Sequence, residues 1–373
     1  MGISEILGLL GGLALFLHGM QMMSSGLEAA AGARMKSILE RLTANRFLGV
    51  LVGAAITAVI QSSSATTVMV VGFVNAGMMT LGQAVWIIMG ANIGTTVTGL
   101  LIALDVGELA PMFAFVGVVL MVFIKEPKLQ HIGQILAGLG VLFIGMGMMS
   151  SSMSPLRDSE PFIRIMSTFS NPLLGILAGA AFTAVIQSSS ASVGILQALA
   201  SSGVISYASS VFVLFGQNIG TCITAVLAAI GTNRNAKPAT LIHLMFNLIG
   251  TAIFTTLFVL FPIAAVVEGT LVLPGEVGRT LSHLIPTDPM AQIAMTHTVF
   301  NITTTLVLLP LGNYLAKLAI RILPDQAVET EDQESMTLAY LTPIQAGGKE
   351  GGLGVSAIVI DQLRNELNRM LSM

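Results

Sequence analysis

An internal duplication governs how this chain can fold. The stretch from Gly53 to Ala65 returns as residues 179–191, with Ile56 replaced by Phe182, and each residue number in the second copy is 126 higher. The same offset, without any gap, relates two further pairs of segments: Asn92-Ile93-Gly94-Thr95 with Asn218-Ile219-Gly220-Thr221, and Gly19-Met20 with Gly145-Met146. The fold must therefore contain two homologous halves built from equivalent elements.

Composition places both halves in a membrane. Hydrophobic residues make up 54% of the chain and charged residues only 9%, with a mean hydropathy of +0.86, whereas soluble domains are roughly 25% charged. Several separate apolar stretches approach the ~20 residues of a spanning helix, and they do not alternate like the strands of an outer-membrane barrel. The sequence therefore predicts an all-α polytopic protein of the inner (plasma) membrane.

Each half carries the polar tetrad Gln-Ser-Ser-Ser within an apolar run. Unpaired polar groups cost several kcal/mol each in hydrocarbon, so this placement needs a reason. A serine in a membrane helix can bond back to its own backbone, but that explanation suits an isolated serine better than four adjacent polar residues present twice. We therefore predict that the tetrads, Gln61–Ser64 and Gln187–Ser190, form the functional site.

The tetrads interrupt apolar runs that are too short to cross a membrane. Apolar residues extend for about 14 positions before Gln61 and about 15 after Ser64, fewer than the ~20 that a span requires. We expect residues 45–80 and their copy, 171–205, to form re-entrant helical hairpins with the tetrads at their tips. Small-residue spacings predict close helix contacts beside these hairpins: Gly49-xxx-Gly53, Gly90-xxx-Gly94, Gly175-xxx-Gly179 and Gly216-xxx-Gly220.

The other apolar stretches predict a transmembrane domain over residues 1–322. The first half, about 3–126, contains spans at 3–26, 82–104 and 109–124, and the second, about 129–262, contains spans at 131–152, 206–230 and 238–262. A further span, about 289–314, lies outside the duplication; His297 in it and His243 in the preceding span are expected to make helix-packing hydrogen bonds. Because each half crosses the membrane an odd number of times, the second half must be upside down, which predicts an inverted-topology repeat.

Loop charges predict the orientation of the chain. Basic residues of the short loops concentrate on the cytoplasmic side of membrane proteins. Under this topology ten of them fall on one side and three on the other: Arg34, Lys36, Arg41, Arg46, Lys125, Lys128, Arg234, Lys237, Lys317 and Arg321 against Arg157, Arg164 and Arg279. The first side, and with it the polar tail at 323–373 and its terminal helix, is therefore predicted to be cytoplasmic. The basic amphipathic stretch 34–42 is expected to lie on the membrane surface.

A hairpin tip of this kind can bind ions. Breaking the helix frees carbonyl groups of the first half-helix and N–H groups of the second, and these suit Na⁺ and an oxyanion, respectively. The serines can cap the second half-helix and donate to a substrate, and Gln61 and Thr57 add oxygens. Neither hairpin core nor either Asn-Ile-Gly-Thr span contains Asp, Glu, Lys or Arg, so a proton relay is not favoured and a bound anion needs an accompanying cation. The absence of a Walker loop argues against transport driven by ATP.

Two tetrads, each followed by a span with Gly-x-Asn-Ile-Gly-Thr, resemble the type II sodium-dependent inorganic phosphate cotransporter family, including its bacterial members. The resemblance covers about residues 1–322. It implies Na⁺-coupled movement of inorganic phosphate by alternating access, with the substrate between the two tips and no enzymatic activity. Animal members carry a disulfide-bonded loop between the halves that is absent here, and many bacterial members continue into a soluble helical domain.

The resemblance also implies the residues of the site. Substrate contacts are expected from Ser62, Ser63, Ser64, Ser188, Ser189, Ser190, Asn92 and Asn218. Na⁺ ligands are expected from Thr57, Gln61, Ser62, Asn92, Thr95, Thr183, Gln187, Ser188, Asn218 and Thr221.

Three alternatives stay open at this point. The chain could transport another oxyanion, such as sulfate or a phosphonate; it could be a passive anion channel, which would need no Na⁺ gradient; or it could be a scaffold for a partner that docks on 325–373, against which the two intact tetrads argue. Phosphate, Na⁺ and the lipid bilayer are the expected partners, without nucleic acid. The sequence leaves homo-oligomerisation, stoichiometry and net direction open.

Overall fold

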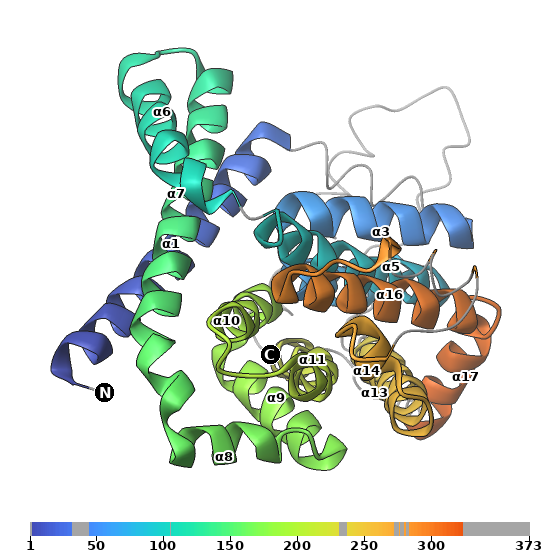
Figure 1. Cartoon of the computed structure of the whole chain (residues 1–373). Helices are drawn as coiled ribbons and strands as arrows, with labels where there is room; N and C mark the ends of the chain where they lie inside the picture. Colours follow the sequence, from blue (N-terminus) through green and yellow to red (C-terminus); the bar gives the residue numbers. More distant parts are fainter. Residues whose placement is uncertain are drawn as a thin grey trace, which may run out of the picture. The chain divides into compact units, whose positions relative to one another are not determined.

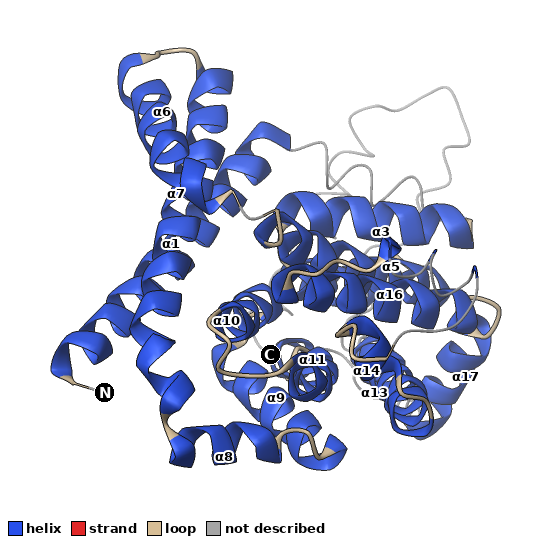
Figure 2. Cartoon of the chain, in the orientation of Figure 1, coloured by secondary structure: helices blue, strands red, loops and turns tan. Residues whose placement is uncertain are grey.

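The described part of the chain is helical throughout. The computed structural model describes residues 2–31, 45–104, 106–230, 237–271, 276, 280 and 283–323, and no strand occurs in these ranges (Figure 2). The amphipathic stretch expected at 34–42 and the tail expected after Leu323 lie outside the described residues. Besides the longer helices described below, short turns occur at η1 (Gly107–Leu109), η2 (Ser154–Asp158) and α14 (Ile263–Val267).

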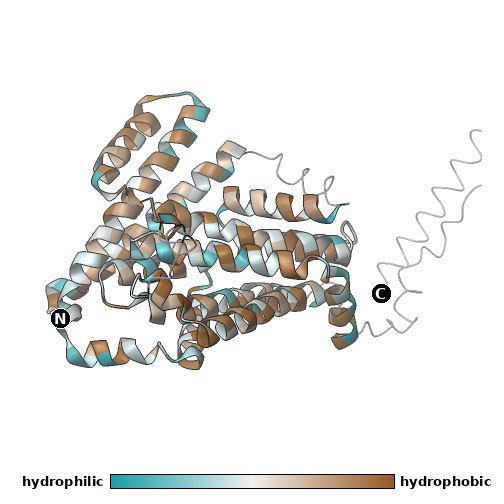
Figure 3. Ribbon diagram, turned by 45° about the vertical axis from the view of Figure 1, so that its right-hand side comes forward, coloured by the Kyte–Doolittle hydropathy of each residue, from teal (hydrophilic) through white to brown (hydrophobic). Residues whose placement is uncertain are grey.

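Five helical segments are long and apolar enough to cross a membrane, or up to seven if each of two bent helix pairs counts as one span, judged by length and composition within the described ranges. The five are α1 (Ile3–Ala31), α5 (Leu81–Ile102), α7 (Pro127–Met153), α11 with α12 (Tyr207–Gly220 and Cys222–Ala229) and α13 (Lys237–Leu260). The bent pairs are α8 (Glu160–Thr168) with α9 (Pro172–Ile186), at 96°, and α16 (Pro289–Leu308) with α17 (Gly312–Ile322), at 83°. Hydrophobic colouring runs along most helices (Figure 3), and the prediction of an all-helical polytopic membrane protein is confirmed.

The two tetrad segments each form a helix, a break and a second helix. In the first, α3 (Arg46–Ile60) is followed by α4 (Ser63–Asn75), and in the second α9 is followed by α10 (Ser189–Ser201). The predicted break in each tetrad is therefore present. Asn45 and Asn171 begin α3 and α9 by accepting hydrogen bonds from the first turn of each helix, which is the usual role of asparagine at this position.

Some predicted elements differ from the structure. The span expected at 289–314 ends at Leu308, and the chain turns into α17. Pro310, which lacks an N–H and cannot continue a helix, stands at this turn. The span expected at 109–124 is α6 (Ala110–Phe123), whose 14 residues are fewer than the ~20 of a full crossing. The helix α8 was not predicted, because its nine residues are amphipathic and not apolar.

The glycine spacings bring α3 against α5 and α9 against α11. A Cβ atom added at Gly90 would come within 3.0 Å of the backbone of α3 at Val50, and one added at the equivalent Gly216 would meet α9 at Ile176 in the same way. Both copies therefore use the same glycine to let backbones touch, as the small-residue spacing predicted.

Glycines also join α1 to α7. A Cβ atom at Gly12 would lie 2.7 Å from the carbonyl oxygen of Gly145, and one at Gly19 would lie 2.6 Å from that of Gly138. These two contacts show that the helices run antiparallel. Figure 1 shows α1 and α7 crossing as a long pair, with α6 packed on α7, beside a bundle that contains α3, α5, α10, α11, α13 and α16.

Candidate functional site

The break in each tetrad is built by a glutamine in the left-handed conformation. Gln61 and Gln187 have φ angles of 57° and 59° and are the non-glycine residues with positive φ in the described part of the chain. This conformation costs a non-glycine residue about 1–2 kcal/mol, so the surrounding contacts must hold it. The following serines, Ser62 and Ser188, accept hydrogen bonds from the N–H groups of Ala65 and Ala191 and so begin α4 and α10.

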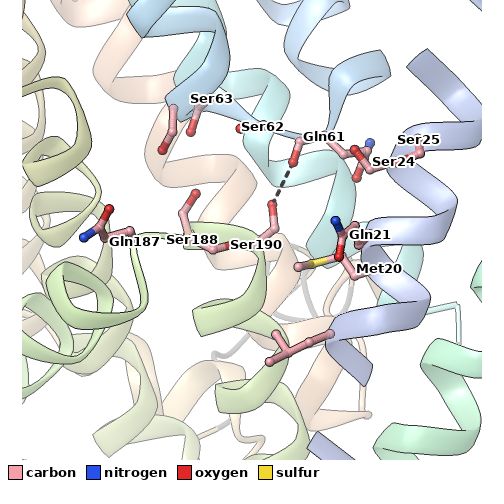
Figure 4. A pocket seen from close by; sticks show the side chains of 13 residues that line it. Met20, Gln21, Ser24, Ser25, Gln61, Ser62, Ser63, Gln187, Ser188 and Ser190 are labelled. Atoms are coloured by element: carbon pink, nitrogen blue, oxygen red, sulfur yellow. Dashed lines mark hydrogen bonds between the residues drawn. The ribbon is translucent and has the colours of Figure 1, made fainter. Parts of the chain in front are cut away.

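The two tips meet across the duplication. Thr98 of α5 donates to the side-chain oxygen Oε1 of Gln61 at 2.6 Å, and its hydroxyl lies 3.1 Å from that of Ser190 in the other tip. Ser190 also lies 3.4 Å from the carbonyl oxygen of Gln61 (Figure 4). The first tip is therefore bonded directly to the last serine of the second tetrad.

An equivalent contact occurs on the other side. Thr224, which is 126 residues after Thr98, donates to the hydroxyl oxygen of Ser64 at 3.0 Å. Each half thus uses a threonine to hold the last serine of the other half's tetrad. Sequence reasoning missed both threonines, although extending the duplicated Asn-Ile-Gly-Thr motif by three residues would have found them.

A cavity of about 350 Å³ lies where the tips meet. Both complete tetrads line it, and α1 supplies a third wall that the sequence did not predict: Leu17, Met20, Gln21, Ser24 and Ser25. Figure 4 shows Gln21, Ser24 and Ser25 approaching from α1, with Gln61 and Ser190 between α1 and Gln187. Ser24 donates to the carbonyl oxygen of Ile60 at 2.6 Å, so α1 satisfies one of the carbonyl groups freed at the end of α3.

The cavity is polar but uncharged. Its lining residues, all within the described part of the chain, include no Asp, Glu, Lys, Arg or His. The described residues also contain no group of His, Cys, Asp and Glu suited to a metal ion. A cation in this cavity would therefore be held by hydroxyl, amide and carbonyl oxygens, which are ligands that hard cations accept.

The other predicted site residues do not line the cavity. Asn92, Thr95 and Thr221 are buried, and each bonds to the carbonyl oxygen four residues earlier in its own helix. Thr57 bonds to Thr66 at 2.9 Å, whereas the hydroxyl of Thr183 is buried without a partner among the described residues.

Asn218 contacts a histidine from outside the duplication. Its amide nitrogen donates to the carbonyl oxygen of Leu214, and its Oδ1 lies 3.0 Å from Nε2 of His297. This contact is of the helix-packing kind expected for His297. For His243 the expectation was wrong within the described chain, because both of its ring nitrogens are buried there without a partner.

Comparison with known proteins identifies the family of the chain. A family model described as Na⁺/Pi-cotransporter matches residues 15–151 and 158–309. The chain belongs to this family. Membership confirms the resemblance drawn from the tetrads, and it makes the protein a member of a transporter family and not of an enzyme family.

Relatives of this Na⁺/Pi-cotransporter family member occur in bacteria and animals. The chain is 31% identical over 316 residues to "Uncharacterized protein YqeW" of Bacillus subtilis, which covers 83% of this chain and 95% of that protein. It is 27% identical to "Putative inorganic phosphate export protein YjbB" of Escherichia coli over 86% of this chain and 56% of that protein, so it spans little more than half of that relative. A shorter match, 36% identity over 29% of this chain and 16% of the relative, is to human "Sodium-dependent phosphate transport protein 2B". No solved structure matches the chain.

Proposed function

We propose that this protein is a secondary transporter that couples Na⁺ to inorganic phosphate and works by alternating access. The observation that carries the proposal is that both tetrads, from two homologous halves, line one cavity. A site shared by two repeats is the arrangement that secondary transporters use near the bilayer midplane. The volume of about 350 Å³ also lies in the range of small-molecule sites.

Phosphate would bind at the starts of α4 and α10. These helix N-termini carry partial positive charge and N–H groups without an intrahelical partner, which favour an oxyanion. Ser63 and Ser189 are the first residues of the two helices, and the hydroxyl of Ser63 is buried without a partner among the described residues. The serines of both tetrads are the proposed substrate contacts within the cavity. Asn92 and Asn218, proposed as further substrate contacts, do not line it in this state.

Na⁺ would neutralise the bound anion. The described lining offers no basic side chain, and an uncompensated anion in a low-dielectric site is costly. Within the cavity, Gln61, Ser62, Gln187 and Ser188 supply oxygens for a cation. Among the buried residues proposed as further Na⁺ ligands, Asn92, Thr95 and Thr221 donate to carbonyl groups of their own helices, and these bonds leave oxygen lone pairs that can accept a cation. The hydroxyl of Thr183 has no partner among the described residues.

The contacts between equivalent helices support an inverted repeat. The helix α7 is the copy of α1, and the two run antiparallel with paired contacts, Gly12 to Gly145 and Gly19 to Gly138. Elements related by a two-fold axis in the membrane plane must run antiparallel in this way. We propose that the two tetrad hairpins enter from opposite faces, the first from the cytoplasm. In a Cys222→Ser background, single cysteines replacing Arg46 and Asn171 should be labelled by an impermeant thiol reagent from opposite sides; labelling of both from one side contradicts the inverted repeat.

Uptake into proteoliposomes tests the function. Labelled phosphate should accumulate with an inward Na⁺ gradient and not when K⁺ or choline replaces Na⁺, with sulfate competing weakly. Uptake without Na⁺ would identify a passive channel, and stronger competition by sulfate or a phosphonate would identify another oxyanion as substrate. The same assay addresses direction, because an inward Na⁺ gradient drives import in symport, whereas the name of the Escherichia coli relative refers to export.

A further inference from the structure

The two tip helices differ in how they contact the α1–α7 pair. In the second half, α10 packs closely: Ala198 is fully buried, its carbonyl oxygen lies 3.4 Å from the hydroxyl of Ser150 on α7, and a Cβ atom at Gly194 would collide with the ring of Phe16 on α1. In the first half, the equivalent positions on α4 are open. Val68 is 40% exposed, and a Cβ atom at Gly72 would meet nothing within 4 Å.

The equivalent segments of α1 and α7 also differ in their contacts. The segment Gly19–Ser25 returns as 145–151 with Gln21 replaced by Gly147 as the only change. On α1 this segment faces the cavity, and Ser24 bonds to the carbonyl oxygen of Ile60. On α7 the copy does not line the cavity, and Ser150 contacts α10 instead. Leu17 is 36% exposed, whereas its equivalent, Phe143, is 2% exposed.

We propose that these two serine segments exchange roles during transport. In the opposite-facing state, Ser150 leaves Ala198 and bonds to the carbonyl oxygen of Ile186, so that Ser150 and Ser151 line the cavity. Ser24 leaves Ile60 and bonds to the carbonyl oxygen of Gly72, and α4 packs on the α1–α7 pair through Val68. The exchange rests on the alternating access proposed above, and it assigns the moving contacts to particular residues.

The near-identity of the two segments makes the exchange physically reasonable. A two-state transporter needs two packings of similar free energy, and two nearly identical segments can satisfy each other's contacts. The empty space beside Gly72 provides room on α4 for the contact that α10 now makes. The single difference, Gln21 against Gly147, means that the opposite-facing cavity lacks one amide side chain. That state would therefore hold phosphate less tightly.

Cysteine pairs with a short bifunctional thiol cross-linker test the exchange in the Cys222→Ser background. Two pairs replace residues in contact now, Ser24 with Ile60 and Ser150 with Ala198. Two more replace residues expected to meet only in the opposite-facing state, Ser150 with Ile186 and Ser24 with Gly72. In proteoliposomes all four pairs should cross-link, and Na⁺ with phosphate should shift the yield of the first two pairs in one direction and that of the last two in the other. The exchange is wrong if the first two pairs cross-link and the last two never do.

Two controls separate this result from the proposed function. Cross-linking of the first two pairs reports that each protein is folded, and Na⁺-dependent uptake by the unsubstituted chain is measured in parallel. Cross-linking of all four pairs without such uptake would uphold the exchange and contradict the proposed function. If a double variant cannot be reconstituted, single cysteines replacing Ser24 and Ser150 should be labelled from opposite sides under different ionic conditions, and labelling from one side only would overturn the exchange.

Discussion

The two tetrad tips have the same sequence but different surroundings. Gln61 is 6% exposed, receives the Thr98 hydroxyl and bonds to the carbonyl oxygen of Ala58, whereas Gln187 is exposed. Behind the first tip, Thr57 is bonded to Thr66. Behind the second, the equivalent Thr183 is buried without a partner in the described part of the chain. The difference teaches that two tips of identical sequence can have different partners in the same molecule.

Unpaired oxygens gather behind the second tip. Ser192, the counterpart of Thr66, is fully buried, and its hydroxyl has no partner among the described residues; the same holds for Oε1 of Gln217, whose amide nitrogen donates to the carbonyl oxygen of Ser192 at 3.0 Å. Leaving such a group unpaired costs about 1–3 kcal/mol, so these oxygens favour a cation or water. Of the four threonines proposed as Na⁺ ligands, Thr57, Thr95, Thr183 and Thr221, Thr183 is the one whose hydroxyl has no partner among the described residues.

The largest effect, a loss of folded protein, is expected at the glycine contacts that both halves share. Gly90→Ala and Gly216→Ala each force a methyl group into the backbone of a neighbouring helix, and overpacking typically costs about 1–3 kcal/mol or more. Both variants should give little folded protein, measured by thermal unfolding in detergent. Gly82→Ala, on the same helix as Gly90 but with nothing within 4 Å, is the control and should unfold normally. Normal stability of both test variants would mean that the close packing of the two halves is not required.

Replacing Thr57 and Thr183 with valine should have different effects at the two tips. Thr183→Val removes a proposed Na⁺ ligand and should lower apparent Na⁺ affinity by about tenfold or more, since a bond to a charged group is worth roughly 1.5–3 kcal/mol. Thr57→Val breaks the bond to Thr66 and should mainly lower thermal stability. Na⁺ titration of phosphate uptake measures the first effect, and a melting curve measures the second. Equal loss of Na⁺ affinity in both variants would contradict the prediction that Thr183 contacts Na⁺ whereas Thr57 mainly stabilises the fold.

The first serines of α4 and α10 should matter equally. Ser63→Ala and Ser189→Ala are each expected to reduce phosphate transport by about tenfold, because each removes a hydroxyl bond to a charged substrate. Expression should change little, as alanine fits sterically. Uptake under a fixed Na⁺ gradient measures both variants. Normal transport by both would show that these hydroxyls do not contact the substrate.

The smallest expected effect concerns the threonines that join the halves. Thr98→Val removes the bond to Oε1 of Gln61 and the contact with Ser190, and about fivefold slower transport is expected from the loss of roughly 1 kcal/mol. Thr224→Val should have a weaker effect, because Thr224 holds only Ser64 across the halves and otherwise bonds to its own helix. Initial rates of uptake compare the two. A stronger effect of Thr224→Val would contradict the expectation that the bonds of Thr98 matter more for transport than the bond from Thr224 to Ser64.

The duplication predicted the breaks and the helix contacts but not the complete site. The tetrads could be recognised because polar residues are costly in apolar runs, and the glycine spacings because only glycine allows backbones to touch. The wall formed by α1 could not, since Ser24 meets Ile60 only through packing between distant segments. Asn92 was placed at the site from its motif, yet its amide is bonded to its own helix. The difference between the tips could not be predicted from the tetrads either, because the two tetrads are identical and the contacts of Gln61 and Gln187 depend on how the surrounding helices pack.

The glycine contact between α1 and α7 has a thermodynamic consequence. Gly12 faces Gly145 and Gly19 faces Gly138, and the copies of Gly12 and Gly19 are Gly138 and Gly145. Exchanging the two halves therefore turns each of these two contacts into the other. In the proposed alternating-access cycle, the free energy of these contacts is therefore common to both states and cancels from the difference between them. A substitution in this contact changes how much folded protein exists, but it leaves the ratio of the two states unchanged, since only differential interactions shift such an equilibrium.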